Sequence, residues 1–197
     1  MQRKEVTFAS GADTCAAWLC APAGGESHST DPLIVMAHGL TGTRRDRLGA
    51  FAGRFADAGV AALVFDHRGF GHSTGEPDHV DPAMQLEDWR AAIAYARSRP
   101  GVDPDRWRNR ASVGWLLSDY SSIRHAETLP CPWLVCVGEV DNVALPGPAI
   151  AAGRRAPKGV VRTYPGVAHF DIYDGPEHEA VVADEVAFLR RHLVLST

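Results

Sequence analysis

Apolar residues occur along the chain in short runs that end in polar segments carrying glycine or proline. Such runs, each bounded by turn-forming residues, are typical of strands buried on both faces, and therefore of a mainly parallel sheet. Two stretches near the start, 5–9 and 15–20, are joined at 11–13 and predict an N-terminal hairpin. The runs that predict inner strands are 33–37, 60–65, 133–138 and 160–164.

The segments between these runs carry apolar residues at helical spacing. Phe51 and Phe55 share one face of the first predicted helix, and Asp81 suits the N-cap of the second. Strands that alternate with helices indicate a parallel sheet covered on both faces. The sequence therefore predicts one α/β domain over residues 1–197, with an antiparallel edge at its N-terminal end. The predicted helices are 44–58, 82–99, 146–155 and 176–193.

The composition of the chain limits its possible partners. Hydrophobic residues make up 45% of the 197 residues and charged residues 22%, and the net charge is −4. This balance is typical of a globular protein and favours neither nucleic acid nor an anionic membrane as a partner. The longest apolar runs are too short to cross a bilayer, and the start of the chain has no apolar signal segment. We therefore expect a cytoplasmic location.

The four cysteines form two pairs whose members are five positions apart. On a strand such members face opposite sides, and neither pair is a C-x-x-C, so the spacing does not indicate a metal site. The histidines of the loop 66–73 also lack a recognised metal-ligand spacing. We expect no metal, and small buried thiols in a reducing compartment. The cysteines are Cys15, Cys20, Cys131 and Cys136.

The predicted strand 33–37 ends in the sequence His38-Gly39-Leu40, which is a candidate anion-binding loop. Ligands of open α/β sheets bind beyond the carboxyl ends of the strands. Gly39 lets the backbone turn sharply, so that the following N–H groups can point at an anion. An oxyanion-binding loop and an ordinary strand-to-helix turn both fit this stretch.

Asp141 and His169 follow two consecutive predicted strands. A carboxylate and then a histidine in this order form the second half of a Ser…Asp…His arrangement. Asp141 would accept a hydrogen bond from one imidazole nitrogen, and His169 would use the other nitrogen as a general base. The alternatives are that Asp141 only stabilises a turn with Asn142 and that His169 is a loop histidine bonded to the backbone.

Together these segments resemble the α/β-hydrolase superfamily, in particular its dipeptidyl-peptidase-like and esterase-like bacterial serine hydrolases. The resemblance covers residues 1–106 and about 128–197. It is carried by the sequences VMAHGLTG at 35–42, FDHRGFGHS at 65–73, CPWLVCVGEVD at 131–141 and YPGVAHF at 164–170.

The resemblance implies an α/β-hydrolase fold and an activity that needs no cofactor. It also implies that Asp141 is the triad acid, that His169 is the triad base and that the backbone N–H of Leu40 forms half of the oxyanion hole. The residues expected at the rim of the site are His38, Gly39 and Asp66.

The nucleophile of this superfamily lies on a strand–elbow–helix with the pattern G-x-S-x-G. We expect this chain to lack both the pattern and the element. Only 24 residues lie between Arg106 and Cys131, where two strands and two helices would need about 50. In one account Ser112 is the nucleophile of a degenerate elbow. In the other, the elbow and the cap are absent near 107–127, and the helical spacing over 113–120 favours this account.

Two functions from different classes therefore remain open. The first is a serine hydrolase that acts on ester or amide bonds of small acyl substrates. The second is a catalytically inactive, hydrolase-derived chain that serves as a binding or assembly module. Without the middle strand of the sheet, strand 33–37 would pair directly with 133–137 or leave an apolar edge exposed, and such an edge predicts a homodimer.

Overall fold

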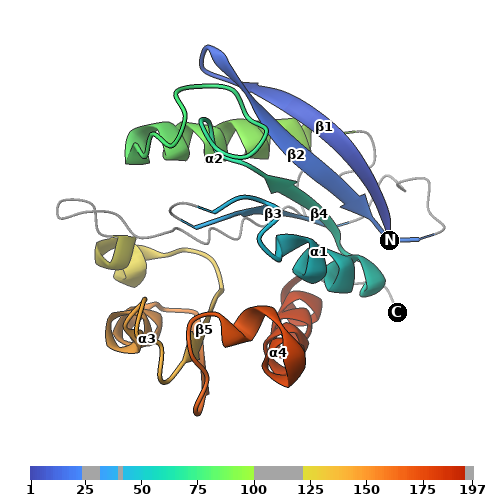
Figure 1. Cartoon of the computed structure of the whole chain (residues 1–197). Helices are drawn as coiled ribbons and strands as arrows, with labels where there is room; N and C mark the ends of the chain where they lie inside the picture. Colours follow the sequence, from blue (N-terminus) through green and yellow to red (C-terminus); the bar gives the residue numbers. More distant parts are fainter. Residues whose placement is uncertain (24–31, 40–41, 100–121, 194–197) are drawn as a thin grey trace. The chain divides into compact units, whose positions relative to one another are not determined.

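The computed structural model describes residues 1–23, 32–39, 42–99 and 122–193. The chain divides into two compact units between Leu117 and Ser118. Each unit contains its own sheet and its own helices (Figure 1). The expectation of a single domain over the whole chain stays a prediction.

The first unit is built on a four-stranded sheet with the strand order β1-β2-β4-β3. The predicted hairpin is present, because β1 and β2 pair antiparallel, and β3 pairs parallel to β4 with Val35 opposite Leu63. Strand β2 joins the hairpin to β4 in antiparallel pairing. The elements of this unit are β1 (Gln2–Ser10), β2 (Asp13–Ala21), β3 (Leu33–Ala37), α1 (Leu48–Asp57), β4 (Ala61–Phe65) and α2 (Pro82–Arg97).

The two helices of the first unit cover opposite faces of its sheet (Figure 1). Val35 and Phe65 belong to the core cluster that packs on Trp89 of α2. Alternate strand residues such as Ile34 and Val64 point to the opposite face and are equally buried. Burial on both faces explains why these strands appear in the sequence as continuous apolar runs.

The two helix starts of this unit differ in how well the sequence predicts them. Asp81 caps α2 as expected, with Oδ1 accepting the N–H groups of Ala83 at 2.7 Å and Met84 at 3.3 Å. Helix α1 begins at Leu48 instead of residue 44, so the expected start is wrong. The reason is that the backbone N–H of Arg44 bonds a carboxylate, and Arg47 has a left-handed φ of 69°.

The second unit is built on a two-stranded parallel sheet, in which β5 and β6 pair with Leu134 opposite Val160. Helix α3 packs on both strands and α4 on β5. The predicted strands and helices of this half are confirmed within one or two residues at most boundaries. Its elements are η1 (Ser122–Thr128), β5 (Trp133–Gly138), α3 (Pro146–Arg155), β6 (Gly159–Tyr164), η2 (Asp171–Tyr173) and α4 (Gly175–Leu193).

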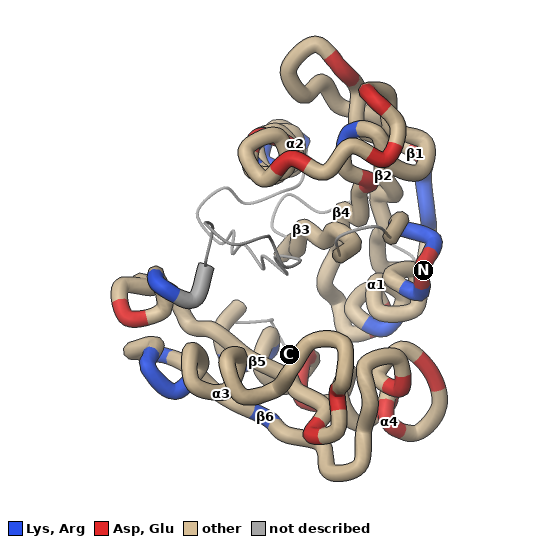
Figure 2. Tube along the Cα trace, turned by 60° about the vertical axis from the view of Figure 1, so that its left-hand side comes forward, with Lys and Arg blue, Asp and Glu red and all other residues tan. Residues whose placement is uncertain are grey.

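Basic residues occupy the last turns of the longer helices in both units. Arg97 lies in the last turn of α2, and Arg190 and Arg191 in that of α4. Arg154 and Arg155 lie in the last turn of α3, where Figure 2 shows basic residues. Positive charge at this end interacts favourably with the helix dipole. Within the described residues, no helix is both long and apolar enough to cross a membrane.

Among the described residues of the first unit, β3 pairs with β4 alone, and among those of the second unit β5 pairs with β6 alone. The expected pairing of 33–37 with 133–137 stays a prediction. The apolar edge expected at 33–37 is not exposed, because Leu33, Ile34, Val35 and Ala37 are at most 2% exposed. Self-association stays a prediction, which sedimentation of the purified chain would test.

Helix α3 lies so close to its sheet that it can carry only glycine at the point of contact. A Cβ at Gly153 would lie 2.7 Å from Cγ2 of Val161 and 3.0 Å from Cγ2 of Val135. We expect Gly153→Ala to lower the free energy of unfolding by about 1–3 kcal/mol, because the core is overpacked. Urea denaturation would measure this change.

Gly147 provides a matched control on the same helix, because a Cβ there has nothing within 4 Å. Gly147→Ala should be neutral or stabilise the protein by up to about 1 kcal/mol through helix propensity. Equal losses in the two variants would contradict the close packing at Gly153.

Candidate active site

Asp141 and His169 lie in contact in the second unit. Nδ1 of His169 is 2.8 Å from Oδ2 of Asp141. The two residues are 28 positions apart in the sequence, and they meet because they follow the carboxyl ends of two parallel neighbouring strands. Within the described residues, Nε2 of His169 has no hydrogen-bond partner. This nitrogen is the one that could exchange a proton with a substrate or nucleophile.

The carboxylate of Asp141 is held by its own loop. Oδ1 accepts the backbone N–H groups of Val143 at 2.9 Å and Ala144 at 2.8 Å, which leaves Oδ2 for His169. Burial opposes the charge, but the hydrogen bonds from His169 and the two N–H groups outweigh it, so the pKa of Asp141 is lowered. An ionised Asp141 accepts Nδ1–H and leaves Nε2 as the basic nitrogen. The turn role and the pairing role of Asp141 therefore coexist.

A close backbone contact brings the two loops together. A Cβ at Gly138, the last residue of β5, would collide with the carbonyl oxygen of Val167. The same oxygen accepts the N–H of Val140 at 3.2 Å. The loops after β5 and β6 thus leave the sheet side by side, at the separation that the Asp141–His169 hydrogen bond requires.

The loop that carries His169 is supported by residues for which the sequence held no clear signal. Oδ2 of Asp171 accepts the N–H of Ala168 at 2.8 Å, immediately before His169. Nδ1 of His178 on α4 lies 3.1 Å from the carbonyl oxygen of Ile172 in η2. Asp171 opens the short helix η2 and His178 lies inside a regular helical pattern, so local spacing does not distinguish them from other polar residues.

Tyr173 lies next to this pair. Burial raises the pKa of its phenol, and the neighbouring charges of Asp141 and Glu185 raise it further. The phenol is therefore protonated at neutral pH. It adds no negative charge beside Asp141.

The candidate anion-binding loop starts in the first unit with a buried histidine. Nε2 of His38 accepts the backbone N–H of His67 at 3.1 Å, so Nδ1 carries the proton and donates to the carbonyl oxygen of Gly39 at 2.7 Å. Burial lowers the pKa of His38 and keeps the ring neutral. His38 thus braces the end of β3 against the end of β4. Leu40, the expected oxyanion donor, lies outside the described residues.

Asp66 holds the other end of the same loop. Oδ1 accepts the backbone N–H of Arg44 at 2.6 Å, and Oδ2 accepts Nη1 of Arg44 at 2.8 Å and the N–H of His72 at 3.2 Å. Arg44 continues to Glu5 of β1 at 2.9 Å. Asp66 is buried and Gly39 is exposed. Asp66 therefore supports the loops from beneath, and a role at the rim stays a prediction.

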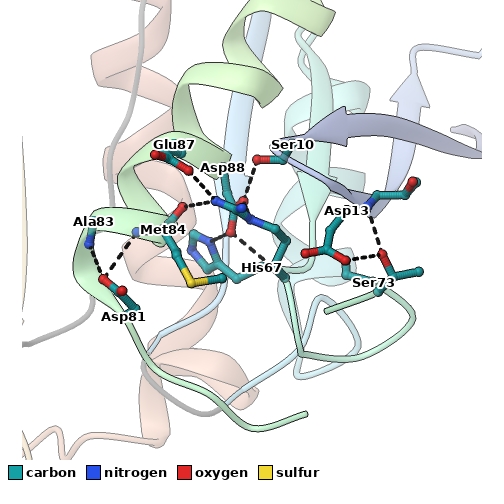
Figure 3. A network of polar contacts seen from close by, with 12 residues as sticks. Ser10, Asp13, His67, Ser73, Asp81, Ala83, Met84, Glu87 and Asp88 are labelled. Carbon is teal, nitrogen blue, oxygen red and sulfur yellow. Dashed lines mark hydrogen bonds and ion pairs between the residues drawn. The ribbon is translucent and has the colours of Figure 1, made fainter. Parts of the chain in front are cut away.

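A second buried carboxylate, Asp88 of α2, accepts hydrogen bonds from two segments, the end of β1 and the loop after β4 (Figure 3). Ser10 Oγ donates at 2.6 Å, Arg68 Nε at 2.6 Å and the Arg68 N–H at 3.1 Å, and Nδ1 of His67 lies at 3.2 Å. Burial opposes ionisation, but these hydrogen bonds outweigh it and lower the pKa of Asp88 to about 2. The sequence held one signal for the hydrogen bonds of Asp88, which is that this charged residue lies beside the apolar face of the helix predicted at 82–99.

The expectation that the chain lacks the letters G-x-S-x-G is wrong, because they occur at 71–75 around Ser73. This serine lies in the loop after β4, whose next helix starts only at Pro82. Its Oγ donates to the carbonyl oxygen of Asp66 at 2.8 Å and accepts the N–H of Ala16 at 2.9 Å. Ser73 therefore fastens the loop to β2. The candidate nucleophile Ser112 lies outside the described residues.

The described residues form no recognisable metal site. Within the described ranges, no group of three or more His, Cys, Asp or Glu side chains is arranged to hold a metal ion. None of the four cysteines forms a disulfide, and Cys15 and Cys20 are buried whereas Cys131 and Cys136 are only partly buried. Burial raises the pKa of Cys15 and of Cys20, so both are protonated.

One family model matches part of the chain. Residues 28–104 match the model of the family described as serine aminopeptidase, S33. The chain is similar to the quorum-quenching protein AidA of Acinetobacter baumannii, with 53% identity over 118 residues, which are 58% of this chain and 38% of that protein. It is also similar to the thiohydrolase aneE of Aspergillus aculeatus, with 39% identity over 75 residues, which are 38% of this chain and 24% of that protein. The matched stretches span less than half of these relatives.

Solved structures define the fold. The α/β hydrolase GrgF from Penicillium has a TM-score of 0.79 at 15% identity, with 99% of this chain and 100% of that chain covered. Est1E from Butyrivibrio proteoclasticus, solved with ferulic acid bound, has a TM-score of 0.75 at 18% identity, with 96% and 100% covered. The chain has the α/β-hydrolase fold in a shortened form, and the resemblance to that superfamily is confirmed.

The buried neutral state of His38 makes stability depend on pH. Its pKa lies below the usual value of about 6.5, so the unfolded chain takes up a proton that the folded chain does not. The stability is present above that value and is lost as pH falls below it. We expect the melting temperature of the wild type to fall more between about pH 7.5 and about pH 5.5 than that of His38→Gln. Parallel curves for the two proteins would refute this.

Removing the charge of Asp88 should destabilise the first unit, because Arg68 would then be buried with too few partners. We expect Asp88→Asn to cost about 3 kcal/mol in chemical denaturation. Glu87→Gln is the matched control, because Glu87 bonds the same arginine at 2.9 Å but is exposed, and it should cost less than about 1 kcal/mol. Similar costs for both variants would show that burial of Asp88 is unimportant.

Proposed function

We propose that this chain acts as a serine hydrolase on ester or amide bonds of small acyl substrates. The observation that carries the proposal is the 2.8 Å contact between Oδ2 of Asp141 and Nδ1 of His169. The lowered pKa of Asp141 keeps it ionised, and it therefore holds the imidazole in the tautomer that a general base needs. The name of one relative, a thiohydrolase, supports a hydrolytic reaction.

The proposed reaction has two steps. In the first, Nε2 of His169 takes the proton of a serine hydroxyl while the serine Oγ attacks the substrate carbonyl. The bond to the leaving group then breaks, and the leaving group takes that proton from His169 as the acyl-enzyme forms. In the second, His169 activates a water that releases the acid. The backbone N–H of Leu40 is the proposed donor to the developing oxyanion. Ser112 is the proposed nucleophile.

A second function is an inactive, hydrolase-derived binding module. The interval of 24 residues between Arg106 and Cys131 favours it, because an elbow, its strand and its helices need about twice that length. The engagement of Ser73 in the β4 loop favours it further. The two functions differ in one observable, the presence of a reactive serine.

We also propose a cytoplasmic location with a small molecule as the substrate. A reducing compartment fits four cysteines of which none forms a disulfide. Expression of a tagged full chain followed by cell fractionation would test the location. Recovery outside the cytoplasm would contradict it.

Labelling with a fluorophosphonate probe tests the hydrolase proposal. We expect an adduct on Ser112 that mass spectrometry maps and that Ser112→Ala and His169→Ala abolish. A label on Ser73 would contradict the assignment of the nucleophile. No label on any serine, together with no turnover of p-nitrophenyl acetate above His169→Ala, would establish the inactive module.

The role of the acid can be tested separately. Asp141→Asn should lower the rate of ester hydrolysis by about 10²–10⁴-fold, because the amide no longer holds the productive tautomer. Asp184→Asn is the control in the same unit, and its rate should be unchanged. Asp184 accepts a hydrogen bond from Oη of Tyr164 at 2.9 Å and does not bond Asp141 or His169. An unchanged rate in Asp141→Asn would remove Asp141 from the proposed mechanism.

A further inference from the structure

The loops that carry Asp141 and His169 also hold an unusual concentration of exposed apolar side chains. Among the described residues, six large apolar side chains are exposed, and four of them lie in the second unit. All four stand within four positions of Asp141 or directly after His169. They are 55–71% exposed, and we call them the apolar rim: Val140, Val143, Leu145 and Phe170.

The apolar rim is held by the same hydrogen bonds that position the acid and the base. The N–H of Val143 donates to Asp141, and that of Val140 donates to the carbonyl oxygen of Val167. The ring of Phe170 lies edge-to-face against the imidazole of His169, with centroids 4.8 Å apart. The backbone that presents these side chains is therefore ordered before any ligand arrives.

The position of the rim indicates a ligand. Single exposed apolar residues are common on protein surfaces and need no explanation. Several together mark a binding surface, and in this fold ligands bind beyond the carboxyl ends of the strands. These four residues belong to the two loops that follow β5 and β6, and the hydrogen bond between Asp141 and His169 joins those loops. An apolar group bound on them would lie on the loops that hold the proposed general base.

We infer that the apolar rim binds an aliphatic chain of the substrate. It would therefore select esters or amides with longer alkyl chains over those with short ones. This inference rests on the proposed function and adds the substrate class to it. The aliphatic chain belongs either to the acyl group or to the leaving alcohol of the substrate. Both groups present the same methylene groups to Leu145 and Val143. Each methylene that the rim buries should tighten binding by about fourfold.

Methyl NMR of the full chain tests this inference without any need for turnover. The probes are hexanoate, hexan-1-ol and acetate. We expect hexanoate or hexan-1-ol to shift the methyl signals of Val143 and Leu145 and the ring signals of His169, and acetate to bind at least tenfold more weakly. A response to hexanoate alone assigns the rim to the acyl side, and a response to hexan-1-ol alone assigns it to the alcohol side.

A double variant with a matched control makes the test specific. Val143→Ser with Leu145→Ser should weaken binding of the six-carbon probe by at least about tenfold. Leu86→Ser is the control, because Leu86 is an exposed leucine on α2 in the other unit, and it should leave binding unchanged. Equal effects of the two changes, or no shift of the rim methyl signals, would overturn the inference.

Two further measurements distinguish a bound aliphatic chain from a bound second copy, and the apolar site from the hydrolase. Concentration-dependent association that the double variant abolishes would show that a second copy covers the rim, and would overturn the inference. Binding of the six-carbon probe without fluorophosphonate labelling would disprove the hydrolase and leave the apolar site standing. Fluorophosphonate labelling of Ser112 without binding of the six-carbon probe at the rim would support the hydrolase and disprove the apolar site.

Discussion

The end of β5 lies against the carbonyl oxygen of Val167 with no space for a Cβ at Gly138, and the candidate site depends on this backbone contact. It sets the separation at which the next two loops leave the sheet. Val140 then bonds the same carbonyl, and Asp141 comes within 2.8 Å of His169. The attraction between the two side chains only completes a geometry that backbone packing has already determined. The pair therefore needs no large binding energy of its own to be ordered.

The first unit orders its strand-end loops by a different means, the burial of charge. Asp66 and Asp88 are both removed from water, which is costly unless every oxygen finds a donor. Arg44 satisfies the first carboxylate, and Arg68 with Ser10 satisfies the second. The described parts of the loops after β3 and β4 are thus tied by hydrogen bonds to buried carboxylates. Fixed backbone N–H groups are what an anion-binding loop requires.

The local spacing of apolar residues was sufficient to predict the strands and helices. Hydrogen bonds between residues far apart in the sequence could not be predicted from it. The strands and helices follow from apolar spacing, and the contact of Asp141 with His169 follows from their order at consecutive strand ends. The start of α1 was misplaced because Arg44 bonds Asp66, which lies 22 positions away. Asp88 was missed for the same reason, since its partner Ser10 is 78 positions away. A five-letter pattern around Ser73 also shows that an elbow is defined by the strand and helix around it.

The hydrogen bonds of Asp88 all come from residues that precede it in the chain, on β1 and in the loop after β4. The geometry of that loop is thus complete once α2 has formed its first two turns. None of these bonds uses a residue that follows α2, so the contacts that hold the loop after β4 on Asp88 are independent of the sequence downstream of the helix.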